Sequence, residues 1–85
     1  MIEIKQKGSG IIIKGHAGYA EPGKDIVCAA VSTLVATFIN VCDADIIEDE
    51  PDYMELEWKE ETDTTFFLTG LKLVENTYPG HVKIV

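Results

Sequence analysis

The stretch GHAGYAEPGKDIVCAAVS, residues 15–32, joins an expected strand to an expected helix through a loop. His16 stands where the β-branched strand Ile11–Lys14 ends. The segment Ala17–Lys24 is predicted to be a loop because it contains residues that interrupt regular structure: Gly18, Pro22 and Gly23. Asp25 then precedes a helix whose apolar residues recur three and four positions apart, which predicts one buried face: Val27, Val31, Leu34, Phe38 and Val41.

Further strands are expected before and after this helix. Met1–Gln6 alternates isoleucine with charged or polar residues, and Lys7–Gly10 predicts a four-residue hairpin loop to the next strand. After the helix, Ile46–Glu48 is a short strand candidate and Glu50–Asp52 predicts a turn. Tyr53–Lys59 alternates cleanly, as a half-exposed antiparallel strand does, with three residues on its apolar face: Met54, Leu56 and Trp58.

A second helix is predicted over Thr64–Thr77, with Thr62 or Asp63 as its N-terminal cap. Its apolar stripe consists of four residues at helical spacing: Phe67, Leu71, Val74 and Tyr78. Pro79–Gly80 ends the helix, and His81–Val85 has room to add a short final strand.

The order β-β-α-β-β-α, with the short C-terminal strand at the end, predicts an α+β fold. We expect a single two-layer domain over residues 1–85, in which an antiparallel sheet packs against two helices. The first helix is apolar on almost every side, because it also contains Ala29, Ala30, Val35 and Ile39. Such a helix is expected to lie between the sheet and another covering element, for which a second subunit is one candidate, because dimerisation covers apolar surface that a small domain leaves exposed.

The charge of the chain limits its partners. Its 15 acidic and 7 basic residues give a formal net charge of −8, which repels phosphate backbones and attracts basic segments. We therefore expect no direct contact with nucleic acid. The charged residues Glu3, Lys5 and Lys7 interrupt the N-terminal segment, which predicts that it is no signal peptide. No apolar run is long enough to predict a membrane span. We therefore expect a cytoplasmic protein whose two cysteines are reduced thiols.

The chemistry of the central stretch depends on where Cys28 falls. If Asp25 caps the helix, Cys28 occupies its first turn, where backbone N–H groups and the helix dipole favour a thiolate. The loop can bring the His16 imidazole to the sulfur, where it would support the thiolate and protonate a leaving amine. Free N–H groups of the helix start, including that of Cys28, are candidates for stabilising an oxyanion.

Ser32 lies one turn after Cys28 on the same helix face, within reach of the sulfur, the histidine or a substrate. Asp25 has two candidate roles, capping the helix and orienting His16. The spacing leaves a purely structural interpretation open, because a cysteine near a helix start is commonly a small buried hydrophobe.

Other chemistries fit the sequence less well. His16, Cys28, Cys42 and His81 do not have the paired spacings of zinc ligands, so we expect no metal and no organic cofactor. Cys28 and Cys42 lie too far apart along one helix to form a disulfide. Cys42 is therefore interpreted as a core or bystander residue.

The segments Gly15–Ala20 and Asp25–Ser32, with Gly23 between them, resemble the Prp family, the bacterial ribosomal-processing cysteine proteases. The order of the elements and the ending Tyr78–Ile84 are also similar, so the resemblance extends over nearly the whole chain. It implies removal of a short N-terminal extension from a large-subunit ribosomal protein of the L-twenty-seven type. The cleavage motif it implies has apolar residues before the scissile bond.

The same resemblance implies the roles of individual residues. Cys28 matches the nucleophile and His16 its partner, while Asp25 and Ser32 match supporting residues. Gly15 matches a glycine that lets the active-site loop move, and members of the family are homodimers. We expect the loop to order over the bound peptide, as lids do, through these residues: Ala17, Gly18, Tyr19, Ala20, Pro22 and Gly23.

The sequence thus predicts a small cytoplasmic cysteine endopeptidase that acts on a peptide segment of a ribosomal protein precursor. Two alternatives use the same features. One is a non-catalytic binding module, ribosome-associated or from a mobile element, with the same fold. The other is a redox-sensing protein that uses an activated Cys28.

Overall fold

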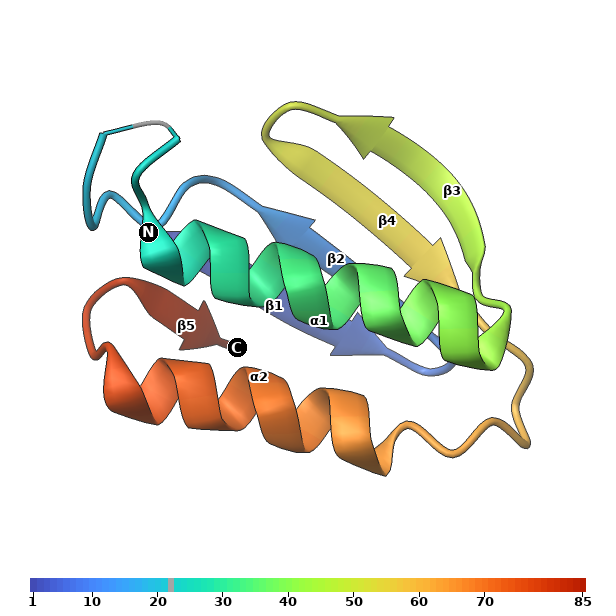
Figure 1. Ribbon diagram of the computed structural model, residues 1–85. Coiled ribbons are helices and arrows are strands. Elements are labelled where there is room, and N and C mark those ends of the chain that lie inside the picture. The colour runs from blue at the N-terminus through green and yellow to red at the C-terminus, as the bar shows by residue number, and fades with distance from the viewer. Residues whose placement is uncertain (22) are drawn as a thin grey trace.

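The computed structural model describes residues 1–21 and 23–85. In chain order the elements are β1 Ile2–Lys7, β2 Gly10–Lys14, α1 Ile26–Cys42, β3 Asp45–Glu50, β4 Tyr53–Glu57, α2 Thr65–Thr77 and β5 Val82–Ile84. The two helices run antiparallel and side by side on one face of the five-stranded sheet (Figure 1). The predicted α+β two-layer architecture is confirmed, and so is the short C-terminal strand.

The sheet has the strand order β3-β4-β2-β1-β5. The pairs β1–β2, β2–β4 and β3–β4 are antiparallel, but β5 pairs parallel with β1, where Ile2 faces Val82. The expectation of a wholly antiparallel sheet was therefore wrong at this edge. The reason is that α2 carries the chain back along the sheet after β4, so β5 must run in the same direction as β4 and β1.

The first hairpin is tighter than predicted. Lys7 pairs with Gly10, so the connection consists of the two residues Gly8 and Ser9 rather than four. Gly8 adopts a φ of 58°, which a glycine provides without steric cost and which two-residue hairpin turns require. The second hairpin turns at Pro51–Asp52, and its strand β3 is exposed along its whole length.

The core lies between the sheet and the two helices, with Phe38 of α1 at its centre. The Phe38 ring stacks on Phe67 of α2 with 4.2 Å between centroids and meets the edge of Trp58 at 5.2 Å. Val27, Val31 and Phe38 are buried as predicted, but Val41 is 69% exposed. Because α1 is apolar nearly all round, the periodicity could not show which of its apolar residues face the core.

The N-cap of α2 is Thr64, whose side chain makes no capping hydrogen bond, so the predicted cap position, Thr62 or Asp63, was wrong by at least one residue. The preceding Asp63 nevertheless binds the first residue of the helix. Its Oδ1 accepts a hydrogen bond from the Thr65 N–H at 3.0 Å. Hydrogen bonding by the side chain and backbone of Thr65 holds the pKa of Asp63 below its ordinary value. Within the described ranges, no helix is both long and apolar enough to cross a lipid bilayer.

Replacing Phe38 by alanine should lower the free energy of unfolding by about 3–5 kcal/mol, because the fully buried ring contacts both Phe67 and Trp58. Urea denaturation measures this loss. Phe38→Leu keeps most of the buried volume and should lose clearly less. A loss below about 1 kcal/mol for the alanine variant would show that Phe38 is not central to the core.

Candidate active site

Gly15 connects β2 to the loop, and the structure explains why a glycine is needed there. Its N–H donates to Asp52 O at 2.8 Å, and its φ is 91°. A Cβ at this position would lie 2.5 Å from Met1 O, closer than side-chain atoms approach a backbone oxygen. The glycine is thus explained by a close backbone approach and a left-handed conformation. The resemblance attributes loop movement to it instead, and that remains a prediction.

Asp25 forms the N-cap of α1, as predicted, and also holds the loop. Its Oδ1 accepts from the N–H groups of Val27 and Cys28, both at 3.0 Å. Its Oδ2 accepts from Tyr19 N–H at 2.9 Å and Ala20 N–H at 3.3 Å. In the described part of the chain, the side-chain hydrogen bonds of Asp25 all come from these four backbone groups, so its carboxylate does not orient His16.

These hydrogen bonds favour the charged carboxylate. The bond from the Cys28 N–H contributes most, and together with the bonds from Tyr19, Ala20 and Val27 it holds the pKa of Asp25 below its ordinary value of 3.8. Burial of the side chain acts in the opposite direction and is outweighed. Asp25 therefore remains a stable anion at the start of the helix.

Cys28 occupies the predicted position in the first turn of α1 and is half-buried. Its Sγ accepts a hydrogen bond from the Ala17 N–H at 3.3 Å. The N–H of Cys28 itself donates to Asp25, so the prediction that this group is free to stabilise an oxyanion was wrong. The Ala17 N–H, which points at the sulfur, is the donor that sequence reasoning missed.

No hydrogen bond joins His16 to Cys28 in this structure. The imidazole is exposed, and among the described residues its ring has no hydrogen-bond partner. Both side chains line one cavity, together with Ser32 one helical turn below Cys28. The structure thus places the three predicted residues around a common space, with the His16–Cys28 bond not formed in this conformation.

That cavity has a volume of about 720 Å³ and runs between α1 and the β3–β4 hairpin. We call it the groove. Its inner surface is apolar, and the side chains that form it include Ile13, Val31, Val35, Ile39 and Met54. The tip of the hairpin supplies an acidic rim, defined as Asp49, Glu50 and Asp52. The groove therefore offers an apolar floor beside the cysteine and negative charge along one edge.

The acidic rim takes part in none of the ion pairs found among the described residues. Ion pairs found in the described part of the chain are Lys14–Glu3 and Lys72–Glu75, and both lie elsewhere. Burial, followed by the charge of Glu55 and its hydrogen bond with the Tyr53 hydroxyl, raises the pKa of Tyr53 beside the rim. The charges of Glu48 and Glu50 add smaller effects in the same direction.

The described residues of the loop, Ala17–Glu21, Gly23 and Lys24, do not line the groove in this conformation. Ala17 is buried in the core, and the Tyr19 ring packs edge-on against Tyr78 and His81, each at 5.3 Å between centroids. Gly18, Ala20 and Gly23 are exposed. Pro22, the remaining residue of the predicted substrate loop, lies outside the described residues. The predicted contacts of the loop with a peptide remain a prediction.

His81 is a second residue that sequence reasoning missed, because it was considered only as a metal ligand. Its Nδ1 lies 2.9 Å from Ala17 O, across 64 residues of chain. The spacing of neighbouring residues does not predict this contact, because His81 and Ala17 come together only when β5 pairs with β1.

Comparison with known proteins identifies the family of this fold and site. The family described as Cysteine protease Prp matches residues 1–83. The chain belongs to the Prp family of cysteine proteases. A curated relative, the ribosomal processing cysteine protease Prp of Mycoplasma genitalium, is 32% identical over 93 aligned residues, which cover 99% of this chain and 94% of the relative.

Solved structures share the Prp fold. The essential ribosomal processing protease Prp from S. aureus, in complex with a covalently linked product peptide, superposes with a TM-score of 0.83 at 22% identity, over 98% of this chain and 94% of that chain. A protein of Streptococcus mutans superposes with a TM-score of 0.71 at 27% identity, over 99% and 91% of the two chains. The protein is thus a cysteine protease with the Prp fold.

Asp25→Ala should lower the melting temperature at neutral pH, because four backbone N–H groups lose their acceptor. The folded pKa of Asp25 lies below 3.8, so its contribution to stability is fully present above pH 3.8 and disappears as the pH falls through the folded pKa. The difference in melting temperature between wild type and variant should therefore shrink below pH 3.8.

Differential scanning calorimetry from neutral to acidic pH measures that difference. Asp49→Ala is the matched control, because it removes an exposed carboxylate for which the described residues provide no hydrogen bond. A difference for Asp25→Ala that stays constant down to the lowest pH at which both proteins fold would contradict this account.

Proposed function

We propose that this cysteine protease cleaves a peptide bond with Cys28 as nucleophile and His16 as its acid–base partner. The proposed reaction removes a short N-terminal extension from a large-subunit ribosomal protein of the L-twenty-seven type. One observation carries the proposal. The half-buried Cys28 thiol stands in the first turn of α1, accepts the Ala17 N–H, and shares the groove with His16.

In the proposed reaction His16 takes the thiol proton, and Sγ of Cys28 attacks the carbonyl carbon of the scissile bond. The oxyanion that forms lies next to Sγ, within reach of the Ala17 N–H that faces the sulfur. His16 returns the proton to the leaving amine as the C–N bond breaks, which leaves a thioester on Cys28. Water, deprotonated by His16, then hydrolyses the thioester and regenerates the thiol.

Asp25 and Ser32 support this reaction without taking part in bond changes. Asp25 fixes the start of α1 and the loop after His16 through its four hydrogen bonds, so it holds the Cys28 backbone in place. Ser32 lines the groove one turn from Cys28, where its hydroxyl can meet a bound peptide.

Two kinds of residue in the groove favour a peptide as substrate. Its apolar floor fits apolar side chains, and its acidic rim fits a basic segment such as ribosomal proteins carry. The relative from Mycoplasma genitalium is a ribosomal processing protease, and the relative from S. aureus has been crystallised with a substrate peptide. Both relatives agree with a ribosomal protein precursor as the substrate.

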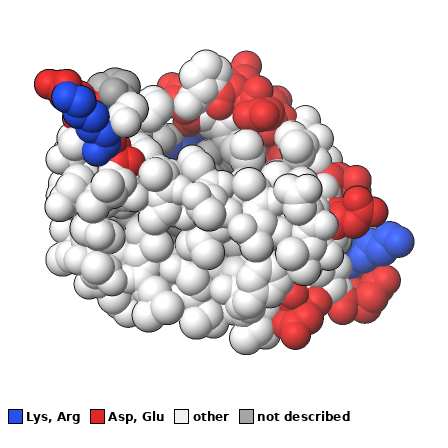
Figure 2. Space-filling model, viewed as in Figure 1, with Lys and Arg blue, Asp and Glu red and all other residues white. Residues whose placement is uncertain are grey.

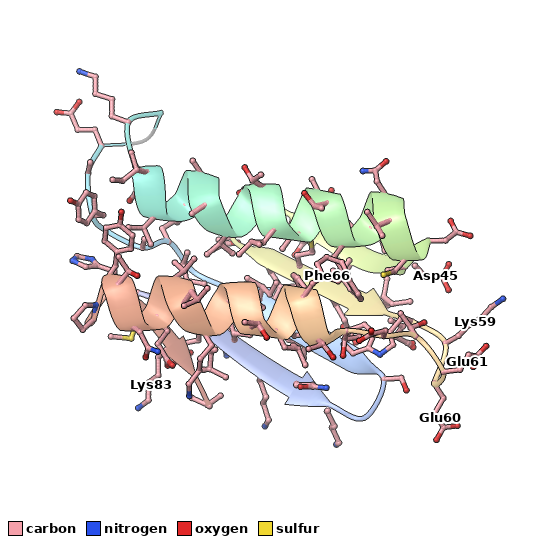
Figure 3. The ribbon with its side chains drawn as sticks, turned by 60° about the horizontal axis from the view of Figure 1, so that its bottom comes forward. Asp45, Lys59, Glu60, Glu61, Phe66 and Lys83 are labelled. Atoms are coloured by element: carbon pink, nitrogen blue, oxygen red, sulfur yellow. The ribbon has the colours of Figure 1, made fainter. Side chains whose placement is uncertain are left out.

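We further propose that the protein acts as a homodimer that pairs through the exposed sides of its helices. Over its 17 residues α1 contains no charged side chain. The face that displays both helices is uncharged across its middle (Figure 2), and the labelled Asp45, Lys59, Glu60 and Glu61 gather beyond the helix ends (Figure 3). In a chain with a net charge of −8, this face allows two copies to meet without repulsion.

Leu73→Glu should convert the dimer to a monomer, because Leu73 is 61% exposed on α2 and a carboxylate there would be buried against the second copy. Sedimentation velocity measures the oligomeric state. Ile47→Glu is the matched control, since Ile47 is 51% exposed on β3, away from the helices, and should leave the dimer intact. A wild-type protein that sediments as a monomer at micromolar concentration would overturn the homodimer.

Cys28→Ala should abolish cleavage of the extended ribosomal precursor from the same host, with a loss of more than about 10⁴-fold in rate. Cys42→Ala is the matched control, because it removes the other free thiol and should cleave like the wild type. Mass spectrometry of the precursor should show one N-terminal truncation with the wild type and the control. Cleavage of the precursor by Cys28→Ala would refute the role of Cys28 as nucleophile. A precursor left uncut by folded wild-type protein would refute the proposed substrate.

A further inference from the structure

His81 donates a hydrogen bond to the active-site loop from the far end of the chain. Its Nδ1 lies 2.9 Å from Ala17 O, and a carbonyl oxygen only accepts, so the proton must sit on Nδ1. The neutral ring with its proton on Nδ1 and the doubly protonated ring both satisfy this bond. The contact therefore fixes which nitrogen donates, whatever the charge of the ring.

The backbone of His81 is held by two hydrogen bonds. The backbone N–H of His81 donates to Tyr78 O at 3.1 Å, and His81 O accepts from Ile2 N–H at 2.9 Å, where β5 begins beside β1. The face of the ring is flanked by Tyr19, which also packs against Tyr78. Backbone and ring are both restrained, so the direction of the Nδ1–H bond is restrained as well.

Ala17 connects this ring to the nucleophile. Its carbonyl accepts from His81, its N–H donates to Cys28 Sγ at 3.3 Å, and the residue is only 2% exposed. The N–H and the C=O of Ala17 belong to successive peptide planes that meet at its Cα, so the bond to His81 fixes one plane and limits the rotations open to the other. One buried residue thus carries a hydrogen bond on each side, one to the sulfur and one to the imidazole.

We propose that His81 is a positioning residue that acts on Cys28 through Ala17. By holding the Ala17 carbonyl, it keeps the Ala17 N–H directed at Sγ, where that N–H stabilises the thiolate and remains in place for the oxyanion. This inference rests on the proposed role of Cys28 as nucleophile. His81 is not among the described residues that line the groove, so its proposed effect on the sulfur runs through Ala17.

The other titratable groups that the structure describes around Cys28 stay unchanged in the test. His16, the acidic rim and Tyr53 line the same groove as the sulfur, and the Asp25 carboxylate accepts the Cys28 N–H. A change in thiolate reactivity on replacing His81 therefore reports the Ala17 contact rather than the loss of any of these groups.

The test compares His81→Leu with His81→Asn. The two side chains have nearly the same shape, but only asparagine offers an N–H donor close to the position of Nδ1. Both are made in the Cys42→Ala background, so that Cys28 alone reacts with iodoacetamide. We expect His81→Leu to slow alkylation at neutral pH by about three- to tenfold and to shift the pH midpoint of the rate upward, with His81→Asn close to wild type.

Melting temperatures and circular dichroism establish that each variant folds. If His81→Leu does not fold, His81→Gln replaces it, because its amide sits one methylene farther out and cannot donate from the Nδ1 position. Equal alkylation profiles for wild type and His81→Leu would overturn the proposal. Equal shifts for His81→Leu and His81→Asn would also overturn it, since the ring would then act only by packing.

Peptide cleavage separates this proposal from the proposed function. If both hold, His81→Leu lowers kcat while KM stays within about twofold, because a contact behind the sulfur acts on the transition state rather than on binding. If Cys28→Ala still cleaves, the proposed function fails. The alkylation profiles test the link from His81 to Cys28 without any substrate.

Discussion

The Asp25 carboxylate is the group on which the rest of this site depends. It is the only side chain in the described residues that binds both the start of α1 and the loop before it, through two backbone N–H groups on each side. One bond positions the Cys28 backbone, and two others fold the loop back so that Ala17 meets the sulfur. A buried anion that satisfies four donors restrains two segments at once.

The fold supplies a second constraint by placing both helices on one face of the sheet. The helices bury Phe38 and Phe67 against each other, and their outward sides leave an uncharged surface. The β3–β4 hairpin extends past α1 on the other flank, so the groove opens along the side of α1 that carries Cys28 (Figure 1). One helix thus contributes to the core, to the groove and to the outer face, which explains why it is apolar nearly all round.

Local patterns predicted most of this structure. The alternation of apolar and charged residues in Tyr53–Lys59 predicted β4, and the three- and four-residue spacing of apolar residues predicted α1. Asp25 predicted where α1 begins, because an N-cap depends only on neighbouring residues. The direction of β5 and the exposure of Val41 depend on how distant elements pack, which no local pattern contains. The same holds for the two hydrogen bonds of Ala17. The hydrogen bonds of Ala17 to Cys28 and of His81 to Ala17 bridge 11 and 64 residues.

The two walls of the groove differ in how firmly they are built. The α1 wall is backed by the core, whereas β3 is exposed at every position, pairs only with β4, and has an irregular register between Ile46 and Glu48. Opening the outer wall therefore exposes little apolar surface and requires few hydrogen bonds to break. The groove thus combines one wall that the core fixes, next to the thiol, with an outer wall that can shift at a small cost in buried apolar surface.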